Sequence, residues 1–202
     1  MSFVFPSLPV PNRGSRICDV PEALYFTDDD AANELIAKNP LALLIGFALD
    51  QQVTVPTAFT GPRKLQQRLG GLDAAAIAGM DPGALEAAFR EKPAIHRFPG
   101  NMARRVQELC ATIVSEYGGD AARVWTDAKD DADLRARIGS LPGFGEMKIK
   151  ALGSVLAKRF DVPAAQGLVP NHPTLGDVDS REALERYQAA KREYKARLRA
   201  SG

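Results

Sequence analysis

Residues 141–145, LPGFG, place two glycines two positions apart behind a proline, between two stretches of helical pattern. Proline stops the incoming helix, and glycines let the backbone turn through conformations that a side chain would block. The glycines also leave amide N–H groups bare at the start of the next helix, where an anion binds well. Lys148 and Lys150 follow at once and add positive charge. This combination suits binding of a phosphate backbone without recognition of bases.

The same turn has a simpler interpretation, in which the glycines only allow the two helices of an αα-hairpin to pack closely. The apolar pattern on both sides of the turn also fits a DNA-binding hairpin: Leu134, Ile138, Ala151, Val155 and Leu156. The turn and this flanking pattern, taken together, favour DNA binding over packing alone.

The composition is that of an ordinary soluble globular protein, with 202 residues of which 45% are hydrophobic and 25% charged. Because the net charge is only +1, attraction to a polyanion requires a local positive patch. Cys18 and Cys110 are far apart and lack CxxC spacing. A four-cysteine zinc site or iron–sulfur cluster made by this chain alone is thereby excluded, and a reduced pair is favoured over a disulfide.

The sequence contains no apolar run of the roughly 18 residues that a membrane span needs. Its N-terminus lacks the basic and apolar regions of a signal peptide. We therefore expect no membrane partner and a cytoplasmic location, with association to the nucleoid if the protein is bacterial.

Helical signals dominate after residue 24. The segment LALLIGFALDQQ is apolar nearly all round, which predicts a buried central helix, and MARRVQELCATIVSEYG predicts a long amphipathic helix. Thr27, followed by three aspartates, predicts a helix start. Further helices are predicted near 56–69, 72–79, 81–91, 120–126 and 180–199. With no convincing run of alternating β-branched residues, the sequence predicts an all-α fold of about ten helices in two lobes.

Four segments divide the chain. We expect an extended proline-rich arm at 1–23, a helical domain at 24–160 with the hairpin at about 130–160, and a proline-rich irregular segment at 161–179. Residues 180–202 then form a C-terminal helix that carries seven Lys or Arg against three Glu, on or beside the same domain. Its positive face fits contact with DNA and a solvated terminal helix equally well.

Three stretches together resemble one protein family. LPGFG followed by a basic helix resembles the helix-hairpin-helix of the HhH-GPD superfamily of base-excision DNA glycosylases. LLIGFALDQQVTV resembles the central helix of that superfamily, which ends in a glutamine-bearing turn, and HRFPGNMARRVQELCATIV resembles its long helix between the lobes. The resemblance covers residues 24 to about 160 and implies the two-lobed glycosylase fold.

The resemblance implies roles for residues of both motifs. Leu141, Gly143 and Gly145 would form the phosphate-binding turn, where main-chain carbonyls in the family often hold a monovalent cation such as sodium or potassium. Gln52, alone or with Gln51, falls where family members insert a side chain into the gap left by an extruded base. A polar pair that merely ends a helix is the simpler alternative for these glutamines.

A second marker of the family is a lysine in the hairpin turn, present in those members that also cleave the strand through a Schiff base. The residues expected at the DNA are Met147, Lys148 and Lys150. Met147 occupies the place of the lysine, and Lys148 points about 100° away from it on a helix. We therefore expect no lyase activity, and without the C-terminal four-cysteine cluster of some members we expect no iron–sulfur cluster.

The aspartate for which the family is partly named is not matched. Its position falls near Ala165 without gaps, or near Leu168 if FDVP is aligned with the family's pattern, and neither residue is acidic. Asp50 and Asp177 are the candidate replacements. Each also has a structural alternative, as a helix-end carboxylate for Asp50 and as part of a turn and cap before the last helix for Asp177.

Three other residues have both kinds of interpretation. His96 is a candidate for binding phosphate or orienting water, although a lone loop histidine is more often structural. Trp125 and Tyr117 are candidates for stacking on a flipped base, although such positions on a helix more often belong to the core.

These observations lead us to expect a monomer that binds double-stranded DNA carrying a damaged or extruded base. The favoured activity is monofunctional hydrolysis of an N-glycosidic bond, with an alkylated base as one substrate and no cofactor in the chemistry. The alternative is a catalytically inactive module that binds DNA damage on the same scaffold. A helical interaction protein with no DNA role is a third hypothesis.

Overall fold

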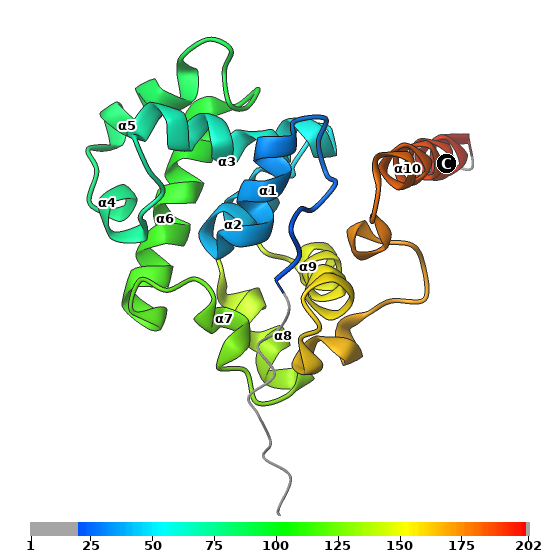
Figure 1. Cartoon of the computed structure of the whole chain (residues 1–202). Helices are drawn as coiled ribbons and strands as arrows, with labels where there is room; N and C mark the ends of the chain where they lie inside the picture. Colours follow the sequence, from blue (N-terminus) through cyan, green and yellow to red (C-terminus); the bar gives the residue numbers. More distant parts are fainter. Residues whose placement is uncertain (1–19, 201–202) are drawn as a thin grey trace, which may run out of the picture.

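The structure is a computed structural model that describes residues 20–200, apart from the side chains of Lys191 and of residues 194–200. Cys18 and most of the arm predicted at 1–23 lie outside these residues. The described chain forms ten α-helices and two short 3₁₀-helices and contains no strand, so the predicted all-α fold is confirmed (Figure 1).

The helices follow one another with short connections. The first five are α1 (Asp30–Lys38), α2 (Pro40–Leu49), α3 (Val55–Leu69), α4 (Ala74–Ala78) and α5 (Pro82–Arg90). The next four are α6 (Pro99–Tyr117), α7 (Arg123–Thr126), α8 (Asp131–Ser140) and α9 (Glu146–Arg159). The segment predicted to be irregular contains η1 (Pro163–Leu168) and η2 (Leu175–Asp177), and α10 (Arg181–Ala200) ends the chain.

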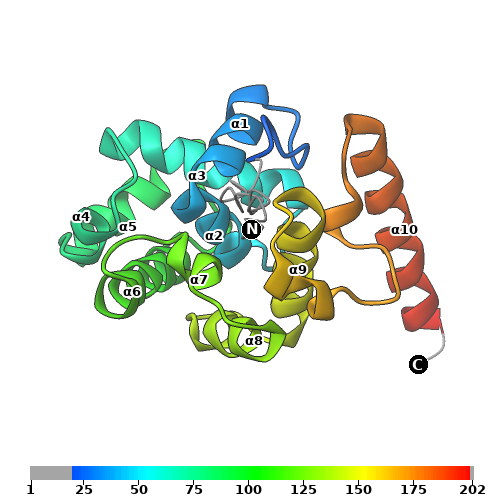
Figure 2. The same cartoon turned by 60° about the horizontal axis from the view of Figure 1, so that its bottom comes forward.

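The elements pack in two groups. Helices α1 to α6 contact one another, with α4 and α5 lying on the long α6. Helix α9 packs against α8, η1 and η2, and α10 follows on η2 at the edge of the molecule. Figure 2 shows α3 to α6 on one side, α9 and α10 on the other, and α2 between them. One continuous cluster of buried apolar side chains spans both groups, so the two lobes share a core.

Helix α2 forms the centre of this core. Every residue from 41 to 49 is buried, as the all-round apolar pattern predicts. Phe47 packs edge to face on Phe59 of α3, whose ring also meets Phe26. The absence of a side chain at Gly46 lets α3 come close, because a Cβ there would lie 2.5 Å from the Phe59 ring. This contact fixes where α2 ends and therefore where Asp50 and the glutamines begin.

Most helix starts are satisfied by a side chain. Helix α1 begins three residues after Thr27, because Asp29 is its cap and accepts a hydrogen bond from Ala32 N–H at 3.2 Å. The Thr27 hydroxyl instead donates to the side chain of Asn33. The side chains that cap α2, α3, α4, α5 and α8 are Asn39, Thr54, Asp73, Asp81 and Asp130. Among the described α-helices longer than one turn, α6 and α9 begin without a side-chain cap.

No single helix of residues 20–200 is long and apolar enough to cross a membrane. Helices α1 and α2 reach that length and composition only as a pair bent by 115°. The position of α2 in the core accounts for its apolar composition.

The close approach of α2 and α3 leads to a stability prediction. Gly46→Ala adds a Cβ that must displace the buried Phe59 ring, so we expect a loss of about 1–3 kcal/mol in the free energy of unfolding. Gly71→Ala is the matched control, because no heavy atom lies within 4 Å of the added methyl group. Urea denaturation measures both. Equal stability of the two variants would contradict the packing described for Gly46.

Candidate nucleic-acid interface

The hairpin turn, residues 141–145, joins α8 to α9 in a tight backbone reversal. Leu141 and Phe144 are buried and anchor it to the core, and Phe144 N–H donates to the Leu141 carbonyl at 3.1 Å. Gly143 adopts φ +82°, a left-handed conformation that favours glycine. A Cβ at this position would also lie 2.8 Å from Cδ of Arg105 on α6. Both its backbone and its neighbour therefore require glycine at 143.

Gly145 is exposed, and neither its backbone conformation nor its neighbours require a glycine. Its φ of −86° is ordinary, and no heavy atom lies within 4 Å of the place where a Cβ would stand. It precedes α9 directly, and no side chain caps the first amides of that helix. The space in front of these amides is open, and the helix dipole makes it attractive to an anion.

Charged residues surround the start of α9. Glu146 in its first turn is paired with Arg135 at 2.6 Å and with Lys150 at 3.5 Å, so part of the positive charge of the hairpin is already balanced. Met147 is 77% exposed, and its side chain lines the cavity at the hairpin turn. Lys148 instead turns back onto the core and donates to the Ala48 carbonyl, at the end of α2, at 3.1 Å.

The glutamine loop, residues 50–54, connects α2 to α3 next to the hairpin turn. Gln51 and Gln52 are both exposed. Gln52 has φ +57°, a left-handed conformation that costs a residue other than glycine about 1–3 kcal/mol. Such strain concentrates at functional sites, where the surrounding structure enforces it. Within the described chain, the Gln52 side chain has no hydrogen-bond partner, so it is free to meet a ligand.

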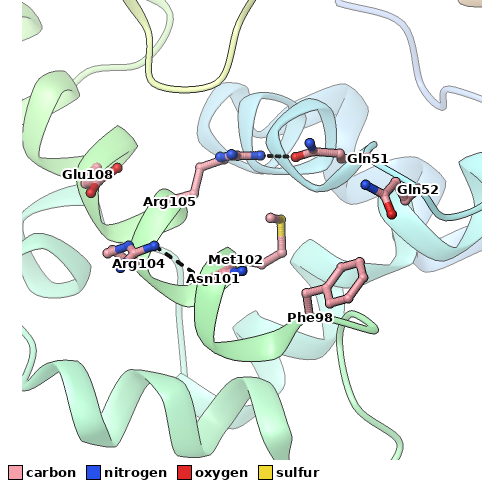
Figure 3. Close-up of a pocket in the computed structure, with 8 residues that line it drawn as sticks. All are labelled: Gln51, Gln52, Phe98, Asn101, Met102, Arg104, Arg105 and Glu108. Carbon is pink, nitrogen blue, oxygen red and sulfur yellow. Dashed lines mark hydrogen bonds between the residues drawn. The ribbon is translucent and has the colours of Figure 1, made fainter.

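Two side chains hold Gln51: His96 from the segment before α6, and Arg105 from α6 itself. His96 is buried and donates from Nε2 to the Gln51 carbonyl at 3.0 Å, because its Nδ1 accepts from Phe98 N–H at 3.0 Å. Burial is the main cause that lowers the pKa of His96, which agrees with this neutral form. Arg105 Nη1 donates to Gln51 Oε1 (Figure 3). The structure thus places His96 as a support of the loop.

Arg105 connects the two motifs. Its side chain packs on Gly143 of the hairpin turn while its guanidinium bonds Gln51 of the glutamine loop. A cavity of about 580 Å³ at the hairpin turn is lined by both Gln51 and Arg105, as is a neighbouring cavity of about 630 Å³. The role of Arg105 has no signal in the local sequence, where it is one of two adjacent arginines on an amphipathic helix.

Three titratable groups, Lys148, Asp50 and Tyr187, are linked by the charge of Asp50. Burial lowers the pKa of Lys148 to about 8, against the opposing effect of the nearby Asp50 carboxylate and with a smaller lowering by Arg105. Asp50 is half-buried at the end of α2. Burial, and then the charge of Asp50, raise the pKa of Tyr187 on α10. Asp50 therefore lies within electrostatic reach of Lys148 and Tyr187.

Asp177, the other candidate acid, belongs to a different part of the molecule. It forms a capping box with Thr174 around η2 and pairs with Lys158 at 2.6 Å. Burial alone would raise the pKa of Asp177, but the bonds from Lys158 and Thr174 outweigh it and hold the pKa below its usual range. Because Lys158 follows Lys148 by ten residues of helix, Asp177 is about 15 Å along α9 from the hairpin cavity.

The positions aligned with the family's aspartate are apolar core. Ala165 and Leu168 are both buried in η1, and Leu168 packs so closely on α9 that a Cβ at Gly153 would lie 2.6 Å from it. Trp125 and Tyr117 are likewise buried in the shared core. None of these residues lines the hairpin cavity, the cavity next to it or a third cavity between α5 and α6.

The structure combines an all-α fold with an uncapped hairpin helix beside a glutamine loop, the arrangement expected of a helix-hairpin-helix protein. Comparison with known families agrees: residues 45–201 match the HhH-GPD superfamily base excision DNA repair protein family. The chain belongs to this superfamily, which implies DNA binding and a role in base excision repair. No curated protein and no solved structure matches the chain significantly.

The two glycines of the hairpin turn lead to opposite predictions. Gly145→Ala should keep the stability of the protein, because its methyl group meets nothing, yet lower affinity for duplex DNA roughly tenfold by obstructing the bare amides. Gly143→Ala should lose about 1–2 kcal/mol of stability because of its left-handed backbone. Denaturation and fluorescence anisotropy measure the two effects. Wild-type affinity in Gly145→Ala would show that no phosphate binds at these amides.

Proposed function

We propose that this protein is a monofunctional DNA N-glycosylase that acts on a damaged base in duplex DNA. The observation that carries this proposal is the meeting of two motifs at one cavity. The uncapped start of α9 and the glutamine loop both line the space of about 580 Å³ at the hairpin turn. Arg105 packs on the phosphate-binding turn and bonds Gln51, so the loop that carries Gln52 is held at a fixed separation from that turn.

Binding begins with the hairpin turn. The amides at the start of α9 bind a backbone phosphate without reading its base. Gln52 then fills the gap left when a base leaves the stack, since its side chain is long, uncharged and able to bond the orphaned partner base. Gln51 positions the loop instead of entering the duplex, because Arg105 and His96 already hold it.

The hydrolytic step needs an anion near the sugar, because positive charge develops there as the base departs. We assign this role to Asp50, which lies beside Lys148 near the hairpin turn, and not to Asp177. Asp50 is half-buried and displaced from the family's usual position. A base that leaves easily is therefore the best target. A cationic alkylated base is of this kind, because it departs as a neutral molecule.

A sodium or potassium ion at the hairpin turn is part of this proposal. The oxygen ligands that such ions prefer would be the carbonyls of Leu141 and Gly143. The Leu141 carbonyl accepts one hydrogen bond and keeps a second lone pair, and within the described chain the Gly143 carbonyl accepts no backbone bond. These two groups fit an ion, which would add positive charge beside the phosphate.

One observation favours a second function, that of a module that binds DNA damage without catalysis. The place of the family's aspartate is occupied by the buried apolar residues Ala165 and Leu168. A protein of this kind would keep the phosphate-binding turn and the glutamine loop and would release no base. The two functions differ only in turnover, so a measurement of base release separates them.

The test is release of base from duplexes that carry alkylated, oxidised or deaminated bases. We expect release from the alkylated duplex, and loss on the order of 100-fold or more in Asp50→Asn with unchanged DNA affinity. Asp177→Asn is the matched control: it removes the charge that pairs with Lys158 and lowers stability but should keep turnover. No release by the wild-type protein on any duplex would favour the binding module.

Borohydride trapping tests the monofunctional assignment. Because burial lowers the pKa of Lys148 to about 8, its amine loses its proton more readily than that of an ordinary lysine, and the uncharged amine is able to attack a sugar aldehyde. We expect no trapped complex, because Lys148 is engaged with the Ala48 carbonyl at the end of α2. A covalent adduct that disappears in Lys148→Gln would contradict this assignment and show a lyase.

A further inference from the structure

The cavity at the hairpin turn is one end of a longer groove. It shares Gln51 and Arg105 with the cavity of about 630 Å³, which shares Phe98, Asn101 and Arg104 with a third cavity of about 620 Å³. The third cavity lies between α5 and α6 and is not needed for binding at the hairpin turn. The groove therefore runs from α9, past the glutamine loop, to the start of α6.

Arginines without a carboxylate partner line this groove. Within the described residues, Arg97, Arg104 and Arg105 have no acidic side chain within 4 Å, whereas Arg90 in the same groove is paired with Glu86 at 2.6 Å. Arg104 bonds only Asn101, at 3.4 Å (Figure 3). In a protein with a net charge of +1, three such cations on one surface form the local positive patch that a polyanion requires.

An exposed aromatic side chain stands among these arginines. Phe98 is 39% exposed and lines both cavities beyond the hairpin turn. The Arg97 guanidinium lies 4.8 Å from the centre of its ring, in a cation–π contact. An exposed ring beside unpaired arginines is typical of surfaces that follow a nucleic-acid backbone and touch its bases.

We infer that Arg97 and Arg104 bind backbone phosphates of the intact DNA strand, the one opposite the extruded base. This inference rests on the proposed function, because it places the lesion strand at the hairpin turn. Gln52 lies between the two ends of the groove and enters the duplex between its strands. The surface on its far side therefore faces the other strand, and Phe98 lies next to the orphaned base.

Acidic residues mark the limits of this surface. Glu86 lies against the start of α6, where a Cβ on Gly100 would be 3.0 Å from its carboxylate, so that helix end is not open to a phosphate. Glu108 lines the middle cavity one helical turn after Arg104. A phosphate avoids both carboxylates, which leaves Arg97 and Arg104 as the two contacts.

The experiment combines a protein variant with a modified DNA strand. Arg97→Gln/Arg104→Gln is compared with wild type on a duplex carrying a stable abasic-site analogue. Neutral methylphosphonates replace the phosphates next to the lesion site in either the intact or the lesion strand. Lys38→Gln/Lys129→Gln is the control, since it removes the same charge from residues that line none of the three cavities.

We expect the arginine variant to bind DNA more weakly than the wild type. The slope of log affinity against log salt should become shallower by about two, one for each phosphate contact that is lost. Methylphosphonates in the intact strand should weaken wild-type binding but cause no further loss in the variant. In the lesion strand they should weaken both proteins equally. The control variant should retain the wild-type slope.

Two outcomes would overturn the inference alone. In the first, the arginine variant binds DNA with wild-type affinity. In the second, the variant loses affinity, but that loss disappears only when the methylphosphonates are in the lesion strand. In both, the wild-type protein still prefers the abasic duplex, so the proposed function stands. A wild-type protein that does not prefer this duplex would overturn the proposed function and the inference with it. Thermal unfolding is the folding control: if the variant unfolds at the wild-type temperature, its weaker DNA binding is not caused by a folding defect.

Discussion

The contact of Arg105 with both Gly143 and Gln51 is the constraint on which the rest of this interface depends. The hairpin turn belongs to one group of helices and the glutamine loop to the other, so neither motif alone fixes the distance between them. Arg105 packs its side chain on Gly143, where any larger residue would displace it, and donates to Gln51 from the other end. One side chain therefore sets the separation between the hairpin turn and the glutamine loop.

Several unfavourable features gather around this contact. Gln52 has a left-handed backbone, α9 begins without a cap, and Lys148 is partly buried with its pKa lowered to about 8. Elsewhere most helices are capped and α2 is fully buried, although Asp161 after α9 also has a left-handed backbone and α6 also begins without a side-chain cap. Departures from local rules that gather at one place are expected at functional sites, where the surrounding core offsets their cost. Here the buried end of α2 and its close contact with α3 provide that support.

The sequence predicted the parts of this site that depend on local patterns. The glycines of the hairpin turn, the buried α2 and the glutamines after it could be identified because each has a signature within a few residues. The supports could not, because His96 and Arg105 contact Gln51 across 45 and 54 residues, and Lys148 reaches Ala48 across 100. The cap of Asp177 on Thr174 is local, and its three-residue spacing is that of a capping box.

The central claim is that the hairpin turn and the glutamine loop act together on damaged duplex DNA. Affinity for a duplex with a stable abasic-site analogue, measured against the intact duplex at two salt concentrations, tests it most directly. The structure predicts a strong preference for the analogue at both concentrations, with affinity for both duplexes falling steeply as salt rises. Equal affinity for the two duplexes would contradict the role of the glutamine loop, and no binding to either would contradict the interface as a whole.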